Sequence, residues 1–121
     1  MMLIGNDIVE INRFNDLCKK EHFLDKYFTL SEKNKVLSSG KPAEKLAGMF
    51  AIKEAVLKAF GLGIGNGIDL KDVVIEYTSL GQPAIKQTPK ISDFLMKNNL
   101  TEIKVSVSHT DSLASAVCVI I

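Results

Sequence analysis

The chain lacks the features that mark several large classes of protein. Its 121 residues carry a formal net charge of only +1, so no general excess of basic residues points to nucleic acid or to an anionic membrane surface. No apolar run approaches the roughly 20 residues that a membrane-spanning helix needs, and no basic leader precedes the first apolar residues. We therefore expect no signal peptide, no membrane partner and no nucleic-acid partner.

Cysteine is also scarce. The two cysteines, Cys18 and Cys118, lie far apart and show neither a CxxC motif nor a Cys/His spacing suited to a metal. We interpret both as reduced thiols in the core and expect the protein to be cytoplasmic.

What is present is an ordinary globular composition, with 46% hydrophobic and 24% charged residues. The length suits one domain spanning residues 1–121. Period-two or β-rich patterns predict strands, and Ala, Leu, Lys and Glu spaced for one face predict helices. Strands are expected at 3–11, 73–77, 84–88, 103–108 and 113–121, and helical segments at 12–28, 29–37, 46–61 and 89–99. Thr29 and Glu32 fit a capping box that opens the 29–37 helix. This order predicts an α+β fold in which a mostly antiparallel sheet packs against one long central helix.

The central helix is the most strongly patterned segment. Residues 46–63 read LAGMFAIKEAVLKAFGLG, with Pro42 placed to open the helix or a turn before it and Gly61 placed to end it. At about 100° per residue, Lys53 falls inside a broad apolar arc, while Glu54 and Lys58 lie together at its margin. A lysine there either extends its ammonium to the surface or meets an anion.

The central helix leads into four glycines within residues 61–67. No Gly-Lys-Ser/Thr follows, so this is not a Walker loop, and the segment follows a helix rather than a strand, unlike a Rossmann fingerprint. Such a segment could bring bare backbone close to a phosphate. A plain turn is the alternative.

Three polar features interrupt the apolar pattern: Asp7 near the end of the first strand, Lys53-Glu54 with Lys58, and Ser108-His109 at a strand–turn junction. Asp7 alone fits a bulge or a carboxylate capped at a strand end. Two carboxylates from separate elements could also hold Mg²⁺ together with phosphate oxygens, and nearby lysines could neutralise the remaining charge. These residues therefore suggest a phosphate and metal site.

Three sequence motifs carry a resemblance over essentially the whole chain. They are IGNDIVEI at 4–11 followed by Arg13, FAIKEAVLKAFG at 50–61, and VSVSH at 105–109, with a weaker match at LGQP, 80–83. In this order and spacing the chain resembles the holo-[acyl-carrier-protein] synthase family, the small single-domain type of 4′-phosphopantetheinyl transferase. The resemblance implies Mg²⁺-dependent transfer of phosphopantetheine from coenzyme A to a serine of apo acyl carrier protein, with release of adenosine 3′,5′-bisphosphate, in support of fatty acid biosynthesis.

The same resemblance implies roles for individual residues. Asp7 and Glu54 match metal ligands, Glu54 is the expected base acting directly or through a water, and Lys58 matches a lysine that stabilises the leaving phosphate. Arg13 matches an arginine that meets the carrier protein, and the family assembles as a homotrimer with active sites at subunit interfaces. The expected contacts to coenzyme A are Lys41, Lys45, Lys53, Gly63, Pro83 and His109.

Two positions depart from the family pattern. Met49 stands where relatives usually have an arginine that holds coenzyme A phosphates, and Leu62 stands where threonine is usual. Lys45 or Lys41 could substitute for that arginine. The alternative to an enzyme is a non-catalytic module on the same fold that binds a nucleotide or a carrier protein.

Overall fold

The structure is a computed structural model and describes residues 1–61 and 67–121. Strands and helices follow the predicted order, and the predicted α+β fold is confirmed. The strands are β1 (Leu3–Glu10), β2 (Ile75–Tyr77), β3 (Pro83–Ile85), β4 (Ile103–His109) and β5 (Leu113–Ile120). The α-helices are α1 (Phe14–Leu17), α2 (Glu21–Tyr27), α3 (Leu30–Leu37), α4 (Pro42–Phe60) and α5 (Pro89–Lys97), and the short 3-10 turns are η1 (Ile11–Arg13) and η2 (Leu70–Asp72).

Helix α4 is the predicted central helix, and it ends at Gly61 as predicted. Pro42 occupies its first turn, and Gly61 caps its carboxyl end in the left-handed conformation with φ of 70°. Proline is preorganised for a first helical turn, and glycine takes a left-handed cap without the steric cost of a Cβ. The helix begins four residues before the predicted start at Leu46 because Pro42 opens the helix itself.

The main sheet has three antiparallel strands in the order β1–β5–β4, so β1 and β4 form its two edges. The register of β1 on β5 is unbroken from the pair of Leu3 with Ile120 to the pair of Glu10 with Leu113. Asp7 pairs with Ala116 in the middle of β1. The prediction that Asp7 lies near the strand end, at a bulge or a capped terminus, is therefore wrong.

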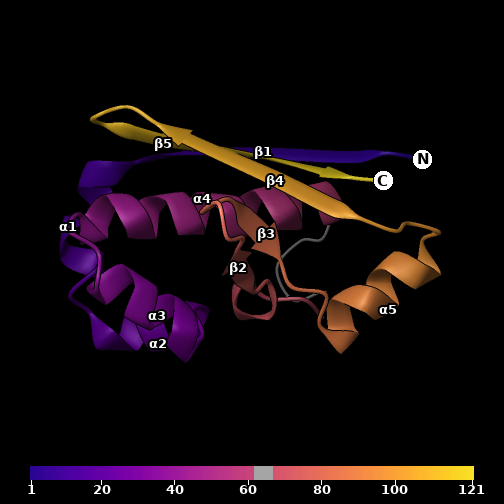
Figure 1. The fold of residues 1–121 in the computed structure, drawn as a ribbon, viewed down its shortest axis with the longest axis horizontal. Helices are drawn as coiled ribbons and strands as arrows, with labels where there is room; N and C mark the ends of the chain where they lie inside the picture. Colours follow the sequence, from indigo (N-terminus) through magenta and orange to yellow (C-terminus); the bar gives the residue numbers. More distant parts are fainter. Residues whose placement is uncertain (62–66) are drawn as a thin grey trace.

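Helix α4 lies along one face of this sheet, as Figure 1 shows. A Cβ at Gly5 would collide with the carbonyl oxygen of Ala55 and the amide nitrogen of Ala59, so β1 and α4 touch backbone to backbone. This contact requires glycine at position 5 and brings the helix-facing residues of β1 next to the carboxyl half of α4.

The other face of the sheet is covered by none of the helices that the structure describes (Figure 1). Successive side chains of a strand point to opposite faces of the sheet, and those on the outer face include Ile4 and Ile8, which are 66% and 61% exposed. On β5, the side chains of Val117 and Leu113 also face outward and are 38% and 36% exposed. One face of the sheet thus forms the core with α4, while the opposite face presents apolar residues.

Helices α2 and α3 form a lobe below the amino-terminal half of α4 (Figure 1). The predicted capping box at the start of α3 is confirmed: Thr29 Oγ1 accepts from the Glu32 amide and Glu32 Oε1 accepts from the Thr29 amide. Aromatic rings fill the interior beside the lobe, with Phe23 packed near both Phe28 and Phe50.

Strands β2 and β3 pair as a separate antiparallel hairpin. Both are shorter than predicted because their outer residues serve neighbouring elements. Val73 ends the η2 turn, and Thr88 caps helix α5 by accepting a hydrogen bond from the Ile91 amide. Both cysteines are buried, and Cys118 has no exposed surface. Within residues 1–61 and 67–121, no helix is both long and apolar enough to span a bilayer.

Candidate functional site

Four of the predicted site residues come together at the β1 edge of the sheet, and we call Asp7, Glu54, Lys58 and Arg13 the carboxylate edge. Asp7 faces α4 from the middle of β1, where its Oδ1 accepts a hydrogen bond from Lys58 Nζ at 2.9 Å. Glu54 and Lys58 stand one turn apart on α4, so both side chains face the same side of the helix.

The carboxylates of this edge are incompletely neutralised. Asp7 Oδ2 is buried and has no hydrogen-bond partner within the part of the chain that the structure describes. The pKa of Glu54 is raised, first by burial and then by the negative charge of Asp7, while Lys58 and Arg13 act in the opposite direction. A buried carboxylate oxygen without a donor, beside a second carboxylate, is the chemistry expected of a cation site before its ion binds.

Two carboxylates are a small ligand set. No cluster of three or more histidine, cysteine or acidic side chains suited to a metal occurs among residues 1–61 and 67–121. Mg²⁺ commonly uses one or two protein carboxylates, with water and substrate phosphates as the remaining ligands. The carboxylate edge therefore fits Mg²⁺ bound with a phosphate substrate better than a metal held by protein alone.

Arg13 forms the outer part of this edge. It is exposed in the η1 turn that directly follows β1, and its guanidinium carbon lies 5.4 and 5.5 Å from the ring centres of Phe14 and Phe50. Stacking on these rings fixes the arginine side chain without using its hydrogen-bond donors. The guanidinium is thus held close enough to Glu54 to affect its pKa, and the rings do not occupy its hydrogen-bond donors.

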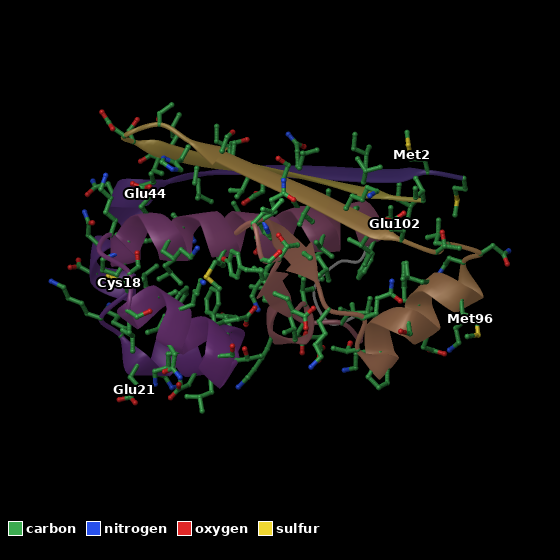
Figure 2. All side chains as sticks on the ribbon, viewed as in Figure 1. Met2, Cys18, Glu21, Glu44, Met96 and Glu102 are labelled. Atoms are coloured by element: carbon green, nitrogen blue, oxygen red, sulfur yellow. The ribbon has the colours of Figure 1, made fainter. Side chains whose placement is uncertain are left out.

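A cleft of about 940 Å³ lies along the other side of α4. Its walls come from α4, the β2–β3 hairpin and strand β4, and we call it the basic cleft. The predicted coenzyme A contacts that line it are Lys41, Lys45, Pro83 and His109. Met49 lines it as well, although its side chain is only 1% exposed. Figure 2 labels Glu44 and Glu102, two further lining residues, far apart along the sheet, so the cleft is elongated.

Lys45 is held against an aromatic wall of the basic cleft. Its Nζ lies 4.2 Å from the ring centre of Tyr77, and Lys35 Nζ lies 4.7 Å from the same ring. Burial, and then repulsion from Lys35, lowers the pKa of Lys45, while burial raises the pKa of Tyr77 to about 12. The ring attracts each ammonium, while the repulsion between the two ammonium groups favours an anion beside them.

His109 occupies the end of the basic cleft nearest the start of α4. Its Nε2 lies 3.0 Å from Glu44 Oε1, and Glu44 Oε2 lies 3.9 Å from Lys41 Nζ. Glu44 therefore orients the imidazole and holds it near the Lys41 ammonium. This arrangement suits recognition of an anionic ligand at the mouth of the cleft.

The carboxylate edge and the basic cleft lie on different sides of one chain. At about 100° per residue, Glu54 is about 180° around α4 from Lys45. Strand β1 carries Asp7 on one edge of the sheet, and strand β4 carries His109 on the other. None of the four carboxylate-edge residues, all within the described ranges, lines the cleft.

Two of the predicted coenzyme A contacts are not in the basic cleft. Lys53 has no exposed surface, and its ammonium is paired with buried Glu32 at 2.8 Å. Its predicted contact with coenzyme A is corrected: Lys53 meets an anion inside the protein rather than a phosphate. Gly63, and Leu62 beside it, lie outside the described residues.

Sequence reasoning missed Glu44, Tyr77 and Glu32. Glu44 has the position of an ordinary acidic residue in a helix first turn, and Tyr77 is a single aromatic residue in a short strand. Glu32 was recognised only as a capping residue. The charge of Lys53 in the apolar arc was the one sequence signal for an anionic partner, and it did not distinguish a buried acid from a bound phosphate.

Comparison with known proteins identifies the family of this chain. The family model described as "4'-phosphopantetheinyl transferase superfamily" matches residues 3–118. A holo-[acyl-carrier-protein] synthase of Protochlamydia amoebophila is 39% identical over 118 residues, which is 96% of this chain and 94% of the relative.

Solved structures show the same fold. The holo-[acyl-carrier-protein] synthase of Neisseria meningitidis matches with a TM-score of 0.88 and 30% identity, covering 98% of this chain and 97% of that one. The Helicobacter pylori synthase, solved in complex with coenzyme A, matches with a TM-score of 0.84 and 30% identity over 98% of this chain and all of that chain. The resemblance seen in the motifs is confirmed along the whole chain, and the protein belongs to the 4′-phosphopantetheinyl transferase superfamily.

Proposed function

We propose that this protein transfers the 4′-phosphopantetheine group of coenzyme A to a serine of apo acyl carrier protein and releases adenosine 3′,5′-bisphosphate. The observation that carries the proposal is the carboxylate edge, where Asp7, Glu54 and Lys58 meet and Asp7 Oδ2 is buried without a partner. Relatives that are named holo-[acyl-carrier-protein] synthases, and one solved with coenzyme A, support the choice of substrates. Fatty acid biosynthesis in the cytoplasm is the proposed setting.

We assign Mg²⁺ to Asp7 and Glu54. When bound, the ion would neutralise the pyrophosphate of coenzyme A and favour negative charge on its oxygens. The unpartnered Asp7 Oδ2 and the raised pKa of Glu54 both favour a cation at this place, because a positive charge would relieve the repulsion between the carboxylates.

Proton transfer is the task of Glu54. The attacking serine oxygen must lose its proton as it forms a bond to the β-phosphorus, and a carboxylate within reach can accept that proton directly or through one water. The bond between the β-phosphorus and the oxygen that bridges it to the α-phosphate then breaks. Lys58, a 55% exposed ammonium at the same edge, can stabilise or protonate the departing phosphate.

The basic cleft is the proposed site for the nucleotide end of coenzyme A. Lys41, Lys45 and His109 supply positive or hydrogen-bonding groups, and Tyr77 and Pro83 supply flat or apolar walls. Lys45 is the better substitute for the arginine usual at position 49, because it is one turn away and already faces the cleft. Lys41 is more exposed and paired loosely with Glu44.

One chain cannot join these two half-sites, since they lie on opposite sides of α4. A homotrimer in which the carboxylate edge of one subunit meets the basic cleft of the next would complete each site. The apolar outer face of the sheet, with Ile4, Ile8 and Val117, is the proposed contact between subunits. Arg13 would then lie at the rim, where the proposed carrier protein docks.

The test is the intact mass of apo acyl carrier protein after incubation with this protein, coenzyme A and Mg²⁺. We expect a gain of about 340 Da, one phosphopantetheine, that disappears when a chelator removes the metal. No gain with several carrier proteins, although the protein binds coenzyme A, would favour the non-catalytic binding module, for which Met49 is the specific observation.

A further inference from the structure

Lys53 and Glu32 form a buried ion pair that the proposed chemistry does not use. Their side chains are 0% and 1% exposed, and Lys53 Nζ lies 2.8 Å from Glu32 Oε1. The lysine immediately precedes Glu54 on α4, while the glutamate is at the third position of α3. A charged pair is thus enclosed between two helices, behind the residues of the site.

Lys53 Nζ donates three hydrogen bonds, and both carboxylate oxygens of Glu32 accept at least one. Lys53 Nζ donates to Glu32 Oε1, to the carbonyl of Tyr27 at 3.1 Å and to the carbonyl of Leu70 at 3.0 Å. Glu32 Oε1 also accepts from the Thr29 amide, and Glu32 Oε2 accepts from the Ile75 amide at 2.8 Å. We call these two side chains and their bonded backbone groups the Lys53–Glu32 junction.

The junction ties four parts of the chain together. Tyr27 ends α2, Thr29 caps α3, Leu70 lies in η2, and Ile75 begins β2. The Phe28 ring packs over the ammonium, with its centre 4.8 Å from Lys53 Nζ. Each bond is directional, so the junction fixes the position of α4 against these segments and does more than fill space.

Strand β2 connects the junction to the basic cleft. Ile75 is bonded to Glu32, and Tyr77, two residues further on, pairs with Pro83 of β3. Two residues of strand span about 7 Å. Tyr77 and Pro83 line the cleft opposite Lys45. A displacement of Ile75 would therefore move the wall that the lysine contacts.

Stability alone does not explain a charged pair at this place. Well-packed apolar residues of similar volume commonly stabilise a core as well as a buried ion pair does. They cannot accept a hydrogen bond from the Ile75 amide or donate one to the Leu70 carbonyl. What the ion pair adds is the placement of the hairpin and of η2 relative to α4.

We propose that the Lys53–Glu32 junction is a positioning device that sets the hairpin wall of the basic cleft against α4 and thereby determines affinity for coenzyme A. This inference rests on the proposed function, since it takes the cleft as the coenzyme A site. Lys53 and Glu32 are positioning residues: neither touches the ligand.

The main variant is the double substitution Lys53→Met with Glu32→Gln. It removes both charges together, so no buried charge is left unpaired, and it keeps side chains of similar size. A glutamine has one acceptor oxygen and cannot serve the Thr29 and Ile75 amides as the carboxylate does. The matched control is Lys33→Met, which removes a half-buried lysine from the next position of α3, where it pairs with the exposed Glu21 and Asp25.

Calorimetric titration with coenzyme A in Mg²⁺ buffer is the first readout, and amide hydrogen exchange at Ile75 is the second. We expect the double variant to bind coenzyme A about tenfold more weakly and to exchange the Ile75 amide faster, with its KM for carrier protein within about twofold of wild type. Lys33→Met should match wild type in all three measurements.

A folded double variant that binds coenzyme A like wild type would overturn the inference, as would equal losses for coenzyme A and carrier protein. If the double variant does not fold, Glu32→Asp replaces it, because that change keeps the charge but shortens the reach to Ile75. A wild-type protein that binds no coenzyme A would overturn the proposed function instead, and unchanged exchange at Ile75 in the variants would still overturn the positioning role.

Discussion

The carboxylate edge and the basic cleft flank the same helix and the same sheet, yet they are built in different ways. At the carboxylate edge, Asp7 Oδ2 lacks a partner and the pKa of Glu54 is raised by burial and by Asp7. In the basic cleft, the polar side chains already have partners: His109 has Glu44, and Lys45 has the Tyr77 ring. Repulsion between the carboxylates of the first region favours the binding of a cation. In the second region, an anion can replace the present partners of the polar side chains.

The supporting structure differs in the same way. Asp7 and Glu54 are fixed by one strand and one helix in direct backbone contact at Gly5. The basic cleft takes its walls from α4, β4 and the hairpin, which are separate in sequence, and the Lys53–Glu32 junction joins the hairpin to α4. The rigid pair of elements suits chemistry that needs close placement of reacting groups, while the composite wall suits recognition of a large ligand.

The largest effect should follow from removing the base. We expect Glu54→Ala to lower kcat for transfer by about a thousandfold or more, because both the proton acceptor and a metal ligand are lost. The melting temperature should stay the same or rise, since the substitution removes a partly buried carboxylate that the folded state disfavours in its charged form. Mass spectrometry of the carrier protein and thermal unfolding measure the two effects.

Glu76→Ala is the control for that substitution, since Glu76 is an exposed glutamate on β2 that lies outside both regions. It should leave kcat and the melting temperature unchanged. Transfer by Glu54→Ala at more than a tenth of the wild-type rate would remove Glu54 from the reaction.

Mixing two inactive variants tests whether the two regions meet between subunits. Glu54→Ala damages only the carboxylate edge, and the double variant Lys45→Ala with His109→Ala damages only the basic cleft. If each site combines the edge of one subunit with the cleft of another, random reassembly of a 1:1 mixture should restore about one quarter of the wild-type sites. Activity is measured after the subunits have been dissociated and allowed to exchange.

The outcome for a site built within one chain is different. Every chain in the mixture would then carry one defect, and the activity would stay at the sum of the two variants. That result, in a mixture whose mass spectrum shows exchanged subunits, would contradict the shared site.

Arg13→Ala should weaken the binding of carrier protein at the carboxylate edge without changing the transfer step. Loss of a guanidinium that is fixed against Phe14 and Phe50 but free to meet an acidic partner should raise the KM for carrier protein about tenfold, and more at low salt. The KM for coenzyme A should change little. Lys20→Ala, which removes an exposed lysine at the start of α2, is the control, and equal effects on both substrates would contradict a docking role.

The sequence predicts the carboxylate edge better than it predicts the basic cleft. Asp7, Glu54 and Lys58 were identified because each breaks a local pattern: an acid in a strand, and a charged pair at the margin of an apolar arc. Helix ends at Pro42 and Gly61 and the capping box at Thr29 follow from local chemistry and were confirmed. Such features depend on residues only a few positions apart, which sequence patterns record directly.

The basic cleft and the role of Lys53 depend on contacts between distant residues. Lys53 pairs with Glu32, 21 positions away, and Glu32 bonds to Ile75, 43 positions away. The apolar arc showed that Lys53 needed a partner, but a buried acid and a bound phosphate satisfy that need equally well on a helical projection. Asp7 was placed at a strand end for a related reason, since strand propensity cannot show that a helix lysine would face it.

Met49→Arg should add positive charge to the basic cleft and so increase its difference from the carboxylate edge. Met49 lines the cleft on α4, one turn from Lys45, and an arginine there can place its stem along the apolar wall and its guanidinium in the cleft. We expect the KM for coenzyme A to fall about threefold with kcat unchanged, because the new contact binds the substrate and the transition state equally. Met49→Leu, which keeps the apolar wall, should match wild type. An unchanged KM in a folded Met49→Arg variant would show that Lys45 already supplies the charge that this wall of the cleft needs.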